Sequence, residues 1–579
     1  MFALDWDLSN LLEGAAATPK EFHLTLDKLE QDIQQFQIEL PEMFGPYQRI
    51  MDSLYEAESV VCCLTGENTS NGEATQLEAR VNALRADFEK VKLKLDEILL
   101  QLPQDEYERI ATSLGKSRFY LDERRRTAKQ KMSLDKEALT SDLSVSGLHG
   151  LMTLYFTYMG EVEFDMKGEK LNLSKLENLF YNPDRVIRIE ALRTMEQELK
   201  KRESVFAQIL NNLVDFRLRT YKARGWDDYL HETLEANRTS RKTVEAMWAA
   251  ISANKGPIVK FMNAKANLLG LNSLGYADYR ASVGKGDFTK ITYDEAAQTI
   301  IDLFSQASPK MGAFARRALE NNWVSASVSD TKRAGGFCTN LPVSKESRIL
   351  MTFADSLSSQ GTLAHELGHG FHNEAMKDLP ALMRTVPYNL AETASTMCEM
   401  MIHDNAIRNA KNNQEKLFLL DEKLTDYMIF SMDLHSRFLF DCAFHEARKK
   451  GFITPSEISE MMVDAQKEGF ANTLDDYLPH FWAFKMHFYL TEAPFYNWTY
   501  TFGYLFSLGV YAHLRASGSF EDKYIALLQD SGSMSAEELA KKHLGVDLTR
   551  IDFWQGAIDW LNKDIEEYLR LALAQERNG

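Results

Sequence analysis

Apolar residues recur at spacings of three and four along most of the chain, which predicts a mainly α-helical protein. The segment "QLEARVNALRADFEKVKLKLDEILLQLP" places one apolar residue per turn on a single helical face: Leu77, Val81, Leu84, Phe88, Val91, Leu95 and Leu99. Pro103 ends this helix. A helix is also predicted after Thr18-Pro19, a pair that suits a cap and first turn, and another over residues 183–225.

The pattern changes near residue 330. "KRAGGFCTNLPVSKESRILMTFADSL" contains a glycine pair, a proline and two short β-favouring runs, around residues 336–339 and 349–353. These runs predict a small sheet in an otherwise helical chain. Helical patterning returns at Thr362 and continues to the C-terminus.

Composition and charge narrow the class of protein. The chain has 579 residues, 45% hydrophobic and 26% charged, which is typical of a soluble globular protein. Its net charge of −18 would repel nucleic acid and anionic lipid, so we expect neither as a partner. No apolar run approaches the 18 or so residues of a membrane span, and we expect no membrane association.

The N-terminal sequence and the cysteine content indicate in which cellular compartment the protein is expected. "MFALDWDLSNLLEG" carries two aspartates and no basic residue, which does not fit a secretory signal or transit peptide. Five cysteines, an odd number, do not form a disulfide framework, and free thiols suit a reducing compartment. We therefore expect a cytoplasmic protein.

The segment "TLAHELGHGFHNE" concentrates three of the chain's 13 histidines. His365, Glu366 and His369 form His-Glu-x-x-His, and positions i and i+4 of a helix share one face, so both imidazoles can reach one metal ion. Zinc favours such ligands and in catalytic sites keeps one position open to water. Glu366, rotated about 100° around the helix, can act as a general base.

A third ligand is required. A metzincin would place Gly and His three and six residues after His369, but His372 and Ala375 stand there, so that class is excluded. His372 is expected to pack or to support a ligand rather than to bind the metal. Pro380 and Pro387 should end the first helix and form a connection.

A new helix is predicted to follow, with Asn389 as its cap. On that helix Glu392 could bind zinc, and Glu399, two turns further on the same face, could hydrogen-bond a ligand histidine. The alternative is that both glutamates are ordinary surface residues. Gly368 and Gly370 each cost about 1 kcal/mol inside a helix, which indicates close approach of a strand or a second helix.

These residues resemble a known family. "GTLAHELGHGFH" followed by "NLAETASTMCE" is similar to the zinc site of the oligoendopeptidase F family, relatives of thimet oligopeptidase and neurolysin. The segments "ILNNLVDFRLRTYKARGWDDYL", "RAGGFC" and "HFYLTEAPFYNWTYTFGYLFS" also match. The similarity covers roughly residue 180 to the end. We therefore divide the chain into an N-terminal helical region, residues 1–182, and a zinc peptidase catalytic domain, residues 183–579.

The resemblance implies one Zn²⁺ bound by His365, His369 and Glu392, with Glu366 as the base. It also implies a gluzincin-type fold with two helical lobes flanking a deep channel that admits short unstructured peptides. Gly335, Gly336 and Phe337 would then belong to an edge strand that pairs with the substrate backbone. A plain turn is the alternative for the glycine pair.

The resemblance further implies that a C-terminal aromatic stretch donates hydrogen bonds to the transition state. Between Tyr477 and Tyr511, 14 of 35 residues are aromatic, against 11% in the whole chain. His487 best matches the family histidine, and Tyr500 and Tyr504 best match the tyrosines, with Tyr496 a close competitor. Few glycines lie between His487 and Gly503, unlike the thimet branch, so the tyrosine alignment stays open by one helical turn.

The favoured function is a zinc-dependent endopeptidase that hydrolyses short oligopeptides. An exopeptidase on the same scaffold and a non-catalytic helical protein that has kept a zinc site are the alternatives. Cobalt or manganese could be held by the same ligands. The sequence does not distinguish a monomer from a homo-oligomer.

Overall fold

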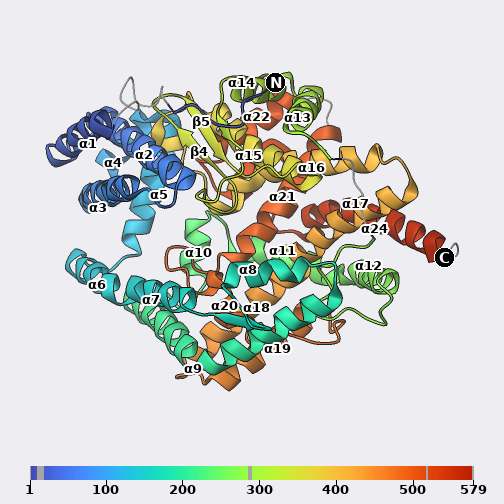
Figure 1. Cartoon of the computed structure of the whole chain (residues 1–579). Helices are drawn as coiled ribbons and strands as arrows, with labels where there is room; N and C mark the ends of the chain where they lie inside the picture. The colour runs from blue at the N-terminus through green and yellow to red at the C-terminus, as the bar shows by residue number, and fades with distance from the viewer. Residues whose placement is uncertain (1, 9–18, 285–289, 517–519, 577–579) are drawn as a thin grey trace. The chain divides into compact units, whose positions relative to one another are not determined.

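The computed structural model describes residues 2–8, 19–284, 290–516 and 520–576 of the chain (Figure 1). They form two compact units, each assembled from three separate segments of sequence. Unit 1 comprises residues 1–130, 289–405 and 510–546, and unit 2 comprises residues 131–288, 406–509 and 547–579. The predicted domain division after residue 182 falls inside unit 2.

Unit 1 contains most of the N-terminal helices and the larger sheet. Its helices are α1 (Pro19–Gln34), α2 (Phe44–Glu67), α3 (Gly72–Gln101), α4 (Gln104–Ser113), α5 (Arg118–Lys129), α13 (Tyr293–Ala307), α14 (Pro309–Glu320), α15 (Leu357–Met376), α22 (Phe520–Asp530) and α23 (Ala536–Leu544), with short 3₁₀ turns η1 (Gly115–Ser117) and η3 (Ala381–Met383). Helix α16 (Tyr388–Arg408) belongs to unit 1 except for its last three residues.

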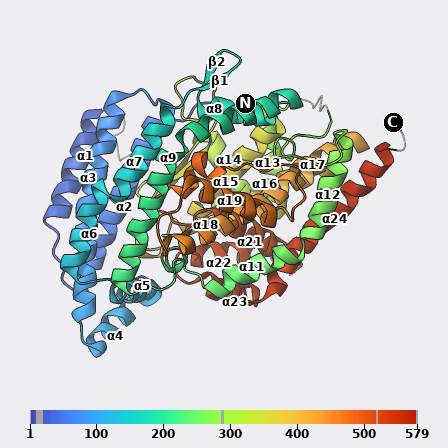
Figure 2. The ribbon, with the colours of Figure 1, turned by 90° about the horizontal axis from the view of Figure 1, so that it is seen from below.

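Unit 2 is also helical. Its elements are α6 (Leu134–Ser146), α7 (Leu148–Gly160), β1 (Phe164–Met166), β2 (Glu169–Leu171), α8 (Leu173–Asn178), η2 (Leu179–Tyr181), α9 (Arg185–Arg224), α10 (His231–Ala236), α11 (Arg241–Ala253), α12 (Lys255–Leu268), α17 (Asn413–Met428), η4 (Ile429–Asp433), α18 (Leu434–Arg448), α19 (Pro455–Gly469), α20 (Phe481–Phe484), η5 (Met486–Phe488) and α24 (Ile551–Glu576). Helix α21 (Asn497–Ala516) begins in unit 2 and ends in unit 1. Within unit 2, α7 packs beside both α6 and α9 (Figure 2).

The predicted mainly α fold with a small sheet is confirmed. Helix α1 begins at Pro19, and α9 ends where Gly225 adopts a left-handed φ of 77° that favours glycine. Six of the apolar residues predicted to line one face of α3 are buried, namely Leu77, Val81, Leu84, Phe88, Leu95 and Leu99. No helix within the described ranges is long and apolar enough to cross a membrane.

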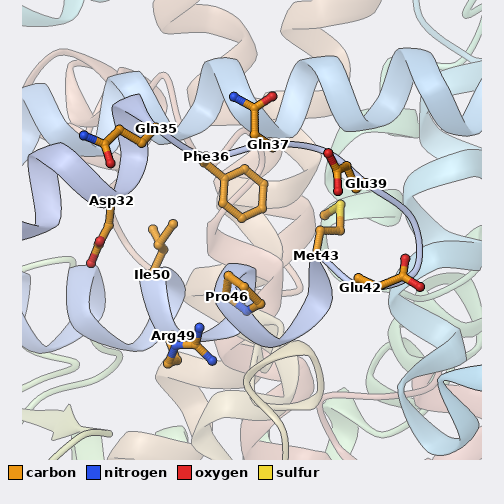
Figure 3. A pocket seen from close by; sticks show the side chains of 10 residues that line it. All are labelled: Asp32, Gln35, Phe36, Gln37, Glu39, Glu42, Met43, Pro46, Arg49 and Ile50. Carbon is orange, nitrogen blue, oxygen red and sulfur yellow. The ribbon is translucent and has the colours of Figure 1, made fainter.

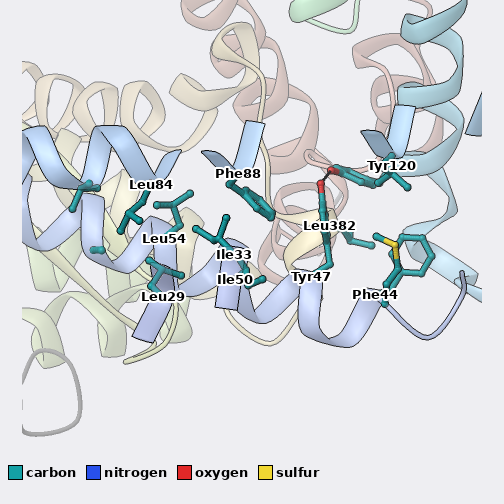
Figure 4. Packing of buried hydrophobic residues seen from close by; sticks show 14 of the residues in the cluster. Leu29, Ile33, Phe44, Tyr47, Ile50, Leu54, Leu84, Phe88, Tyr120 and Leu382 are labelled. Carbon is teal, nitrogen blue, oxygen red and sulfur yellow. Dashed lines mark hydrogen bonds between the residues drawn. The ribbon is translucent and has the colours of Figure 1, made fainter. Parts of the chain in front are cut away.

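A hydrophobic core joins the N-terminal helices of unit 1 (Figure 4). It draws Leu29 and Ile33 from α1, Ile50 from α2 and Phe88 from α3, all almost fully buried. The hydroxyls of Tyr47 and Tyr120 are 2.7 Å apart, so the polar ends of these buried rings are paired. Leu341 and Leu382 belong to the same core, which ties these helices to the sheet and to the segment that follows α15.

The larger sheet has the strand order β3-β5-β4. Strand β3 (Val324–Ser325) pairs in parallel with β5 (Glu346–Leu350), and β4 (Phe337–Leu341) pairs antiparallel with β5. Strand β4 is therefore at an edge of the sheet. The second predicted strand was placed slightly late, because β5 ends at Leu350 and the chain turns toward α15.

In unit 2, the segment that carries His487 is fastened to α9 by a histidine between two carboxylates. His480 Nδ1 lies 2.8 Å from Glu196 Oε2, and His480 Nε2 lies 2.9 Å from Glu203 Oε2. Both ring nitrogens can donate only when the imidazole is protonated. Burial alone would lower the pKa of His480, but the two carboxylates outweigh it and raise that pKa.

We predict that His480→Gln destabilises the protein in a pH-dependent way. Because the folded-state pKa of His480 is raised above about 6.5, its contribution is complete below that pH and is lost as the pH rises through the folded-state pKa. Thermal melts of wild type and variant should therefore differ most near pH 6 and converge as the pH rises through the folded-state pKa of His480. Replacing the exposed His23 by Gln is the control for the loss of a histidine outside this carboxylate pair. A difference that grows with pH would contradict the assignment.

Candidate metal centre and active site

Helix α15 carries His365 and His369 on one face. It follows strand β5 through a short connection, and Ser356 caps it by accepting a hydrogen bond from the backbone N–H of Ser359. The helix begins at Leu357, five residues before the predicted start. The two imidazole rings are separated by one helical turn, with centroids 5.0 Å apart.

Helix α16 supplies the third group. Glu392 Oε2 lies 3.3 Å from His365 Nε2 and 3.4 Å from His369 Nε2. Among the described residues, these three side chains form the one His, Cys, Asp and Glu group whose ligand atoms could share a metal ion. All three belong to unit 1. Residues 27 positions apart in the sequence thus converge as predicted.

The spacing of these atoms suits a zinc ion. Ligand atoms at about 2.1 Å from zinc in a tetrahedral arrangement lie roughly 3.4 Å from one another. The two printed nitrogen–oxygen distances of 3.3 and 3.4 Å match this separation. Burial would raise the pKa of Glu392, yet the hydrogen bonds with His365 and His369 hold that pKa well below its usual range. The donor set is therefore two imidazoles and one carboxylate.

Glu399 supports one of the histidines. Its Oε2 lies 3.2 Å from His365 Nδ1, the ring nitrogen that points away from Glu392. A carboxylate in this position fixes the imidazole tautomer and leaves Nε2 free to bind a metal. On its other side, Glu399 Oε1 lies 3.9 Å from His403 Nε2.

The two glycines of α15 permit close packing. A Cβ on Gly368 would lie 2.6 Å from Ser395 Cα and 2.8 Å from the carbonyl oxygen of Ala394, both backbone atoms of α16. A Cβ on Gly370 would lie 2.7 Å from the ring of Phe314 on α14. The predicted close approach is confirmed for both positions, and a second helix is the neighbour in each case.

Glu366 is buried beside the candidate metal ligands. Its side chain faces Gly336, since a Cβ there would lie 2.9 Å from Glu366 Oε1. Glu366 Oε2 is buried and has no hydrogen-bond partner among the described residues. Burial raises the pKa of Glu366, although the neighbouring His365 and His369 oppose that rise.

His372 lies outside the three-residue cluster. Its Nε2 is 2.8 Å from Ser531 Oγ, in the part of unit 1 that follows α22. Burial lowers the pKa of His372 to about 4, so the ring is neutral near pH 7. The packing role expected for this residue agrees with that environment.

One local prediction is wrong. Asn389 was expected to cap the second helix, but α16 begins at Tyr388 and Asn389 is already inside it. Pro387 immediately precedes the helix, and its carbonyl oxygen accepts a hydrogen bond from the N–H of Ala391 at 3.0 Å, so the first turn starts one residue before the predicted cap. Pro380 and Pro387 do separate α15 from α16, as predicted.

In unit 2, His487 lies in an aromatic cluster with two of the three candidate tyrosines. Its ring centroid is 6.0 Å from that of Tyr496 and 5.9 Å from that of Tyr500, and the two tyrosine rings are 4.9 Å apart. Tyr504 lies elsewhere, buried and stacked on Phe430 at 4.5 Å. The structure therefore groups His487 with Tyr496 and Tyr500.

His487 is held neutral. Burial lowers its pKa to about 3, and the nearby cations Arg437 and Lys485 act in the same direction. A neutral imidazole donates one hydrogen bond near pH 7 without carrying a charge.

The glycine-rich segment precedes the edge strand. Phe337 is the first residue of β4, and Gly335, with a φ of 92°, and Gly336 come directly before it. The carbonyl oxygen of Asn340 accepts a hydrogen bond from Ser59 on α2, so it points away from β5. Because backbone groups of an edge strand alternate in direction, Cys338 presents its N–H and C=O along the same outer edge.

Two cavities lie in unit 1. One, of about 310 Å³, is lined by His369 and by residues from α2, β4 and the segment between α15 and α16. The other, of about 420 Å³, lies at the junction of α1 and α2, where Phe36 and Met43 face it and carboxylates stand around it (Figure 3). It shares no residue with the metal cluster.

Sequence reasoning missed the residues of the first cavity. Asp52 and Arg384, which form an ion pair in its wall, are 332 positions apart. Neither stands in a recognisable motif. No local signal in the sequence could have paired them.

Comparison with known proteins agrees with this geometry. The profile of peptidase family M3 matches residues 302–559, and that of the oligopeptidase F N-terminal region matches residues 99–164. Group B oligopeptidase PepB of Streptococcus agalactiae is 22% identical over 91% of this chain and 88% of its own length. The oligoendopeptidase F homolog of Borreliella burgdorferi is 22% identical over 98% of both chains.

Solved structures share the fold. The crystal structure of a proposed peptidase from Chlamydophila abortus matches with a TM-score of 0.84 at 19% identity, over 98% of both chains. The site defines a metallopeptidase, an enzyme of the metallo-oligopeptidase class. The chain belongs to peptidase family M3, and within it to the oligoendopeptidase F type.

We predict that Gly368→Ala disrupts the metal centre. The added methyl group overlaps the backbone of α16, and relieving it must shift Glu392 away from the two histidines. Overpacking costs about 1–3 kcal/mol, which exceeds the roughly 1 kcal/mol gained from helix propensity. Metal content per chain and the Tm should both fall.

Gly556→Ala is the matched control. Gly556 lies in α24 with open space around its Cα, so alanine there should keep or slightly raise the Tm. Full metal content and an unchanged Tm in Gly368→Ala would contradict the prediction, because the added methyl group would then fit between α15 and α16 without moving Glu392.

Proposed function

We propose that the chain is a zinc-dependent endopeptidase that hydrolyses short oligopeptides. The observation that carries this proposal is the convergence of His365, His369 and Glu392 beside the buried, unpartnered carboxylate of Glu366. The names of the relatives, which describe oligopeptidases and oligoendopeptidases, support the substrate class.

His365 Nε2, His369 Nε2 and Glu392 Oε2 would hold one zinc ion. When bound, zinc supplies Lewis-acid chemistry and lowers the pKa of a water molecule to about 7. Glu399 holds the ring of His365 in the orientation that binding requires, through its contact with Nδ1.

Glu366 is the proposed general base. Its Oε2 takes a proton from the attacking water and later delivers it to the nitrogen of the leaving amine. Burial in a site with little water raises its pKa, which favours a carboxyl group that can both accept and return a proton. Gly336 leaves the room that this side chain occupies.

His487, Tyr496 and Tyr500 are the proposed donors to the oxyanion. Their rings are packed together, and neither His487 nor the two tyrosines is fully buried. A neutral imidazole and two phenol groups can each donate a hydrogen bond as negative charge develops on the peptide oxygen.

Strand β4 is the proposed guide for the substrate backbone. Its outer edge passes from Gly336, beside Glu366, to Cys338, and an extended peptide could add to it as a further strand. Gly335, Gly336 and Phe337 begin this edge. The substrates are therefore unstructured peptides.

A cytoplasmic location is part of the proposal. All five cysteines are unbridged, which suits a reducing compartment. The net charge of −18 is unfavourable for nucleic acid and anionic membranes as partners.

We predict that the purified chain binds one zinc ion and that Glu366→Gln abolishes turnover while retaining the metal. Loss of a general base lowers kcat by about 10²–10⁴-fold. The measurements are zinc by elemental analysis and cleavage of an internally quenched peptide with both ends blocked. A chelator should remove activity, and added zinc should restore it.

The Gln variant is nearly isosteric, so its Tm serves as the control for folding. Robust cleavage by Glu366→Gln would refute the proposed role of this residue. Failure of the blocked peptide to be cleaved, with cleavage of unblocked peptides, would show an exopeptidase instead.

We predict that His487→Ala and Tyr500→Phe lower kcat without changing zinc content or KM. Removing one oxyanion donor costs about 10²–10³ in kcat. Tyr504→Phe is the comparison, because this ring is stacked on Phe430 apart from His487 and its variant should stay near wild-type activity. A larger loss in Tyr504→Phe than in Tyr500→Phe would transfer the role to Tyr504.

A further inference from the structure

The cavity of about 310 Å³ in unit 1 lies directly beside the proposed metal ligands. His369 is part of its wall, and so is Ala391, the neighbour of Glu392. Its other walls come from α2, from β4 and from residues 381–386. Such a volume is at the lower end of ligand pockets and suits one or two side chains rather than a whole peptide.

Strand β4 forms part of the cavity wall. Cys338 and Asn340, two residues apart in that strand, both line it. Side chains of a peptide paired with the outer edge of β4 alternate between its two faces, so one side chain in every two could enter the cavity. The cavity is therefore placed to bind a substrate side chain or chain end.

Arg384 is the most distinctive group in the wall. Its Nη2 lies 2.7 Å from both carboxylate oxygens of Asp52 on α2. Its side chain is only 12% exposed. Among the residues that the structure describes, Nε is buried without a hydrogen-bond partner, and the hydrogen bonds to Asp52 come from Nη2 alone.

A buried guanidinium with an unpaired donor favours the binding of an additional hydrogen-bond acceptor. Buried donors without a partner are costly, and nearly all such groups in proteins are satisfied by protein, water or ligand. The guanidinium stays charged near pH 7 and can donate charge-assisted hydrogen bonds to a second carboxylate beside Asp52. Asp52 occupies only one of the three nitrogens.

The other groups in the wall disfavour a cation. Both oxygens of Asp52 already accept hydrogen bonds from Arg384, and burial raises the pKa of Asp52. A basic side chain would meet the positive charge of Arg384. A purely apolar side chain would cover Nε without satisfying it.

We propose that Arg384 binds a carboxylate of the peptide substrate close to the cleaved bond. The carboxylate is either the side chain of Asp or Glu or the free C-terminus of a short peptide. This proposal rests on the proposed function, because it places the pocket in a peptidase site. It makes Arg384 a determinant of substrate specificity. Asp52, which pairs with Arg384, would weaken the binding of the substrate carboxylate.

The test uses matched peptides that differ by a single charge. One series carries Glu or Gln at each position around the cleaved bond, with both ends blocked. A second series has a free or an amidated C-terminus and no acidic side chain. Wild type should favour the carboxylate member of one series by roughly 10- to 100-fold in kcat/KM, mainly through KM.

Arg384→Met should bring the ratio of kcat/KM between the carboxylate peptide and its uncharged partner close to one. Asp52→Asn should raise it, because it removes the competing carboxylate and frees Nη2. Arg317→Met is the matched control, since Arg317 pairs with Glu374 on α15 at 2.7 Å outside the cavity, and it should keep the wild-type ratio. If Arg384→Met fails to fold, Asp52→Asn still decides the question.

The outcomes separate the alternatives. A preference in the first series identifies a side-chain carboxylate, and one in the second identifies the C-terminus. Equal cleavage of all pairs, a preference for the uncharged member of each pair, or a carboxylate preference that survives Arg384→Met would overturn the proposal. Calorimetric titration of the same peptides into zinc-loaded Glu366→Gln gives an independent readout.

That readout distinguishes two failures. If wild type cleaves no peptide but the titration shows tighter binding of the carboxylate member that depends on Arg384, the peptidase function fails and the pocket stands. If cleavage occurs without carboxylate preference in either measurement, the pocket proposal fails and the peptidase function stands.

Discussion

The contact between the backbones of α15 and α16 is the constraint on which the site depends. At Gly368 the two helices approach so closely that even a methyl group would overlap Ser395 Cα. This approach brings Glu392 to 3.3–3.4 Å from the two imidazoles and lets Glu399 reach the far side of His365. Glycine is costly inside a helix, so its presence here is explained by the geometry that it permits.

Around this contact, the sheet and the N-terminal helices act as a support. Phe314 of α14 packs against Gly370. Gly336, which directly precedes β4, lies against Glu366. Helix α2 contacts β4 at one point of its outer edge, where Ser59 donates to the carbonyl oxygen of Asn340, and it supplies Asp52 to the adjoining cavity. The proposed base, the candidate ligands and the cavity thus share the same few elements of unit 1.

Much of this arrangement could be predicted because it is encoded locally. The 3.6-residue periodicity identified α3 and α9, and the i, i+4 spacing of His365 and His369 placed both on one helical face. Pro380 and Pro387 predicted the break between α15 and α16. Gly368 and Gly370 predicted that another element packs closely against α15. The error at Asn389 arose because the carbonyl oxygen of Pro387 already accepts a hydrogen bond from Ala391, so the first turn starts one residue before the predicted cap. The pairing of Asp52 with Arg384 was out of reach, since it depends on tertiary folding over 332 positions, and only packing could separate Tyr504 from Tyr496 and Tyr500.

The interleaving of the two units has a consequence for how the protein is made. Synthesis proceeds from the N-terminus, yet unit 1 includes residues 510–546 and unit 2 includes residues 547–579. Helix α22 and Ser531, which pack against α15 and His372, lie about 160 residues further along the chain than their partners. Each unit therefore draws on segments from both halves of the chain. Neither corresponds to one continuous stretch whose contacts are complete before the later segments are made.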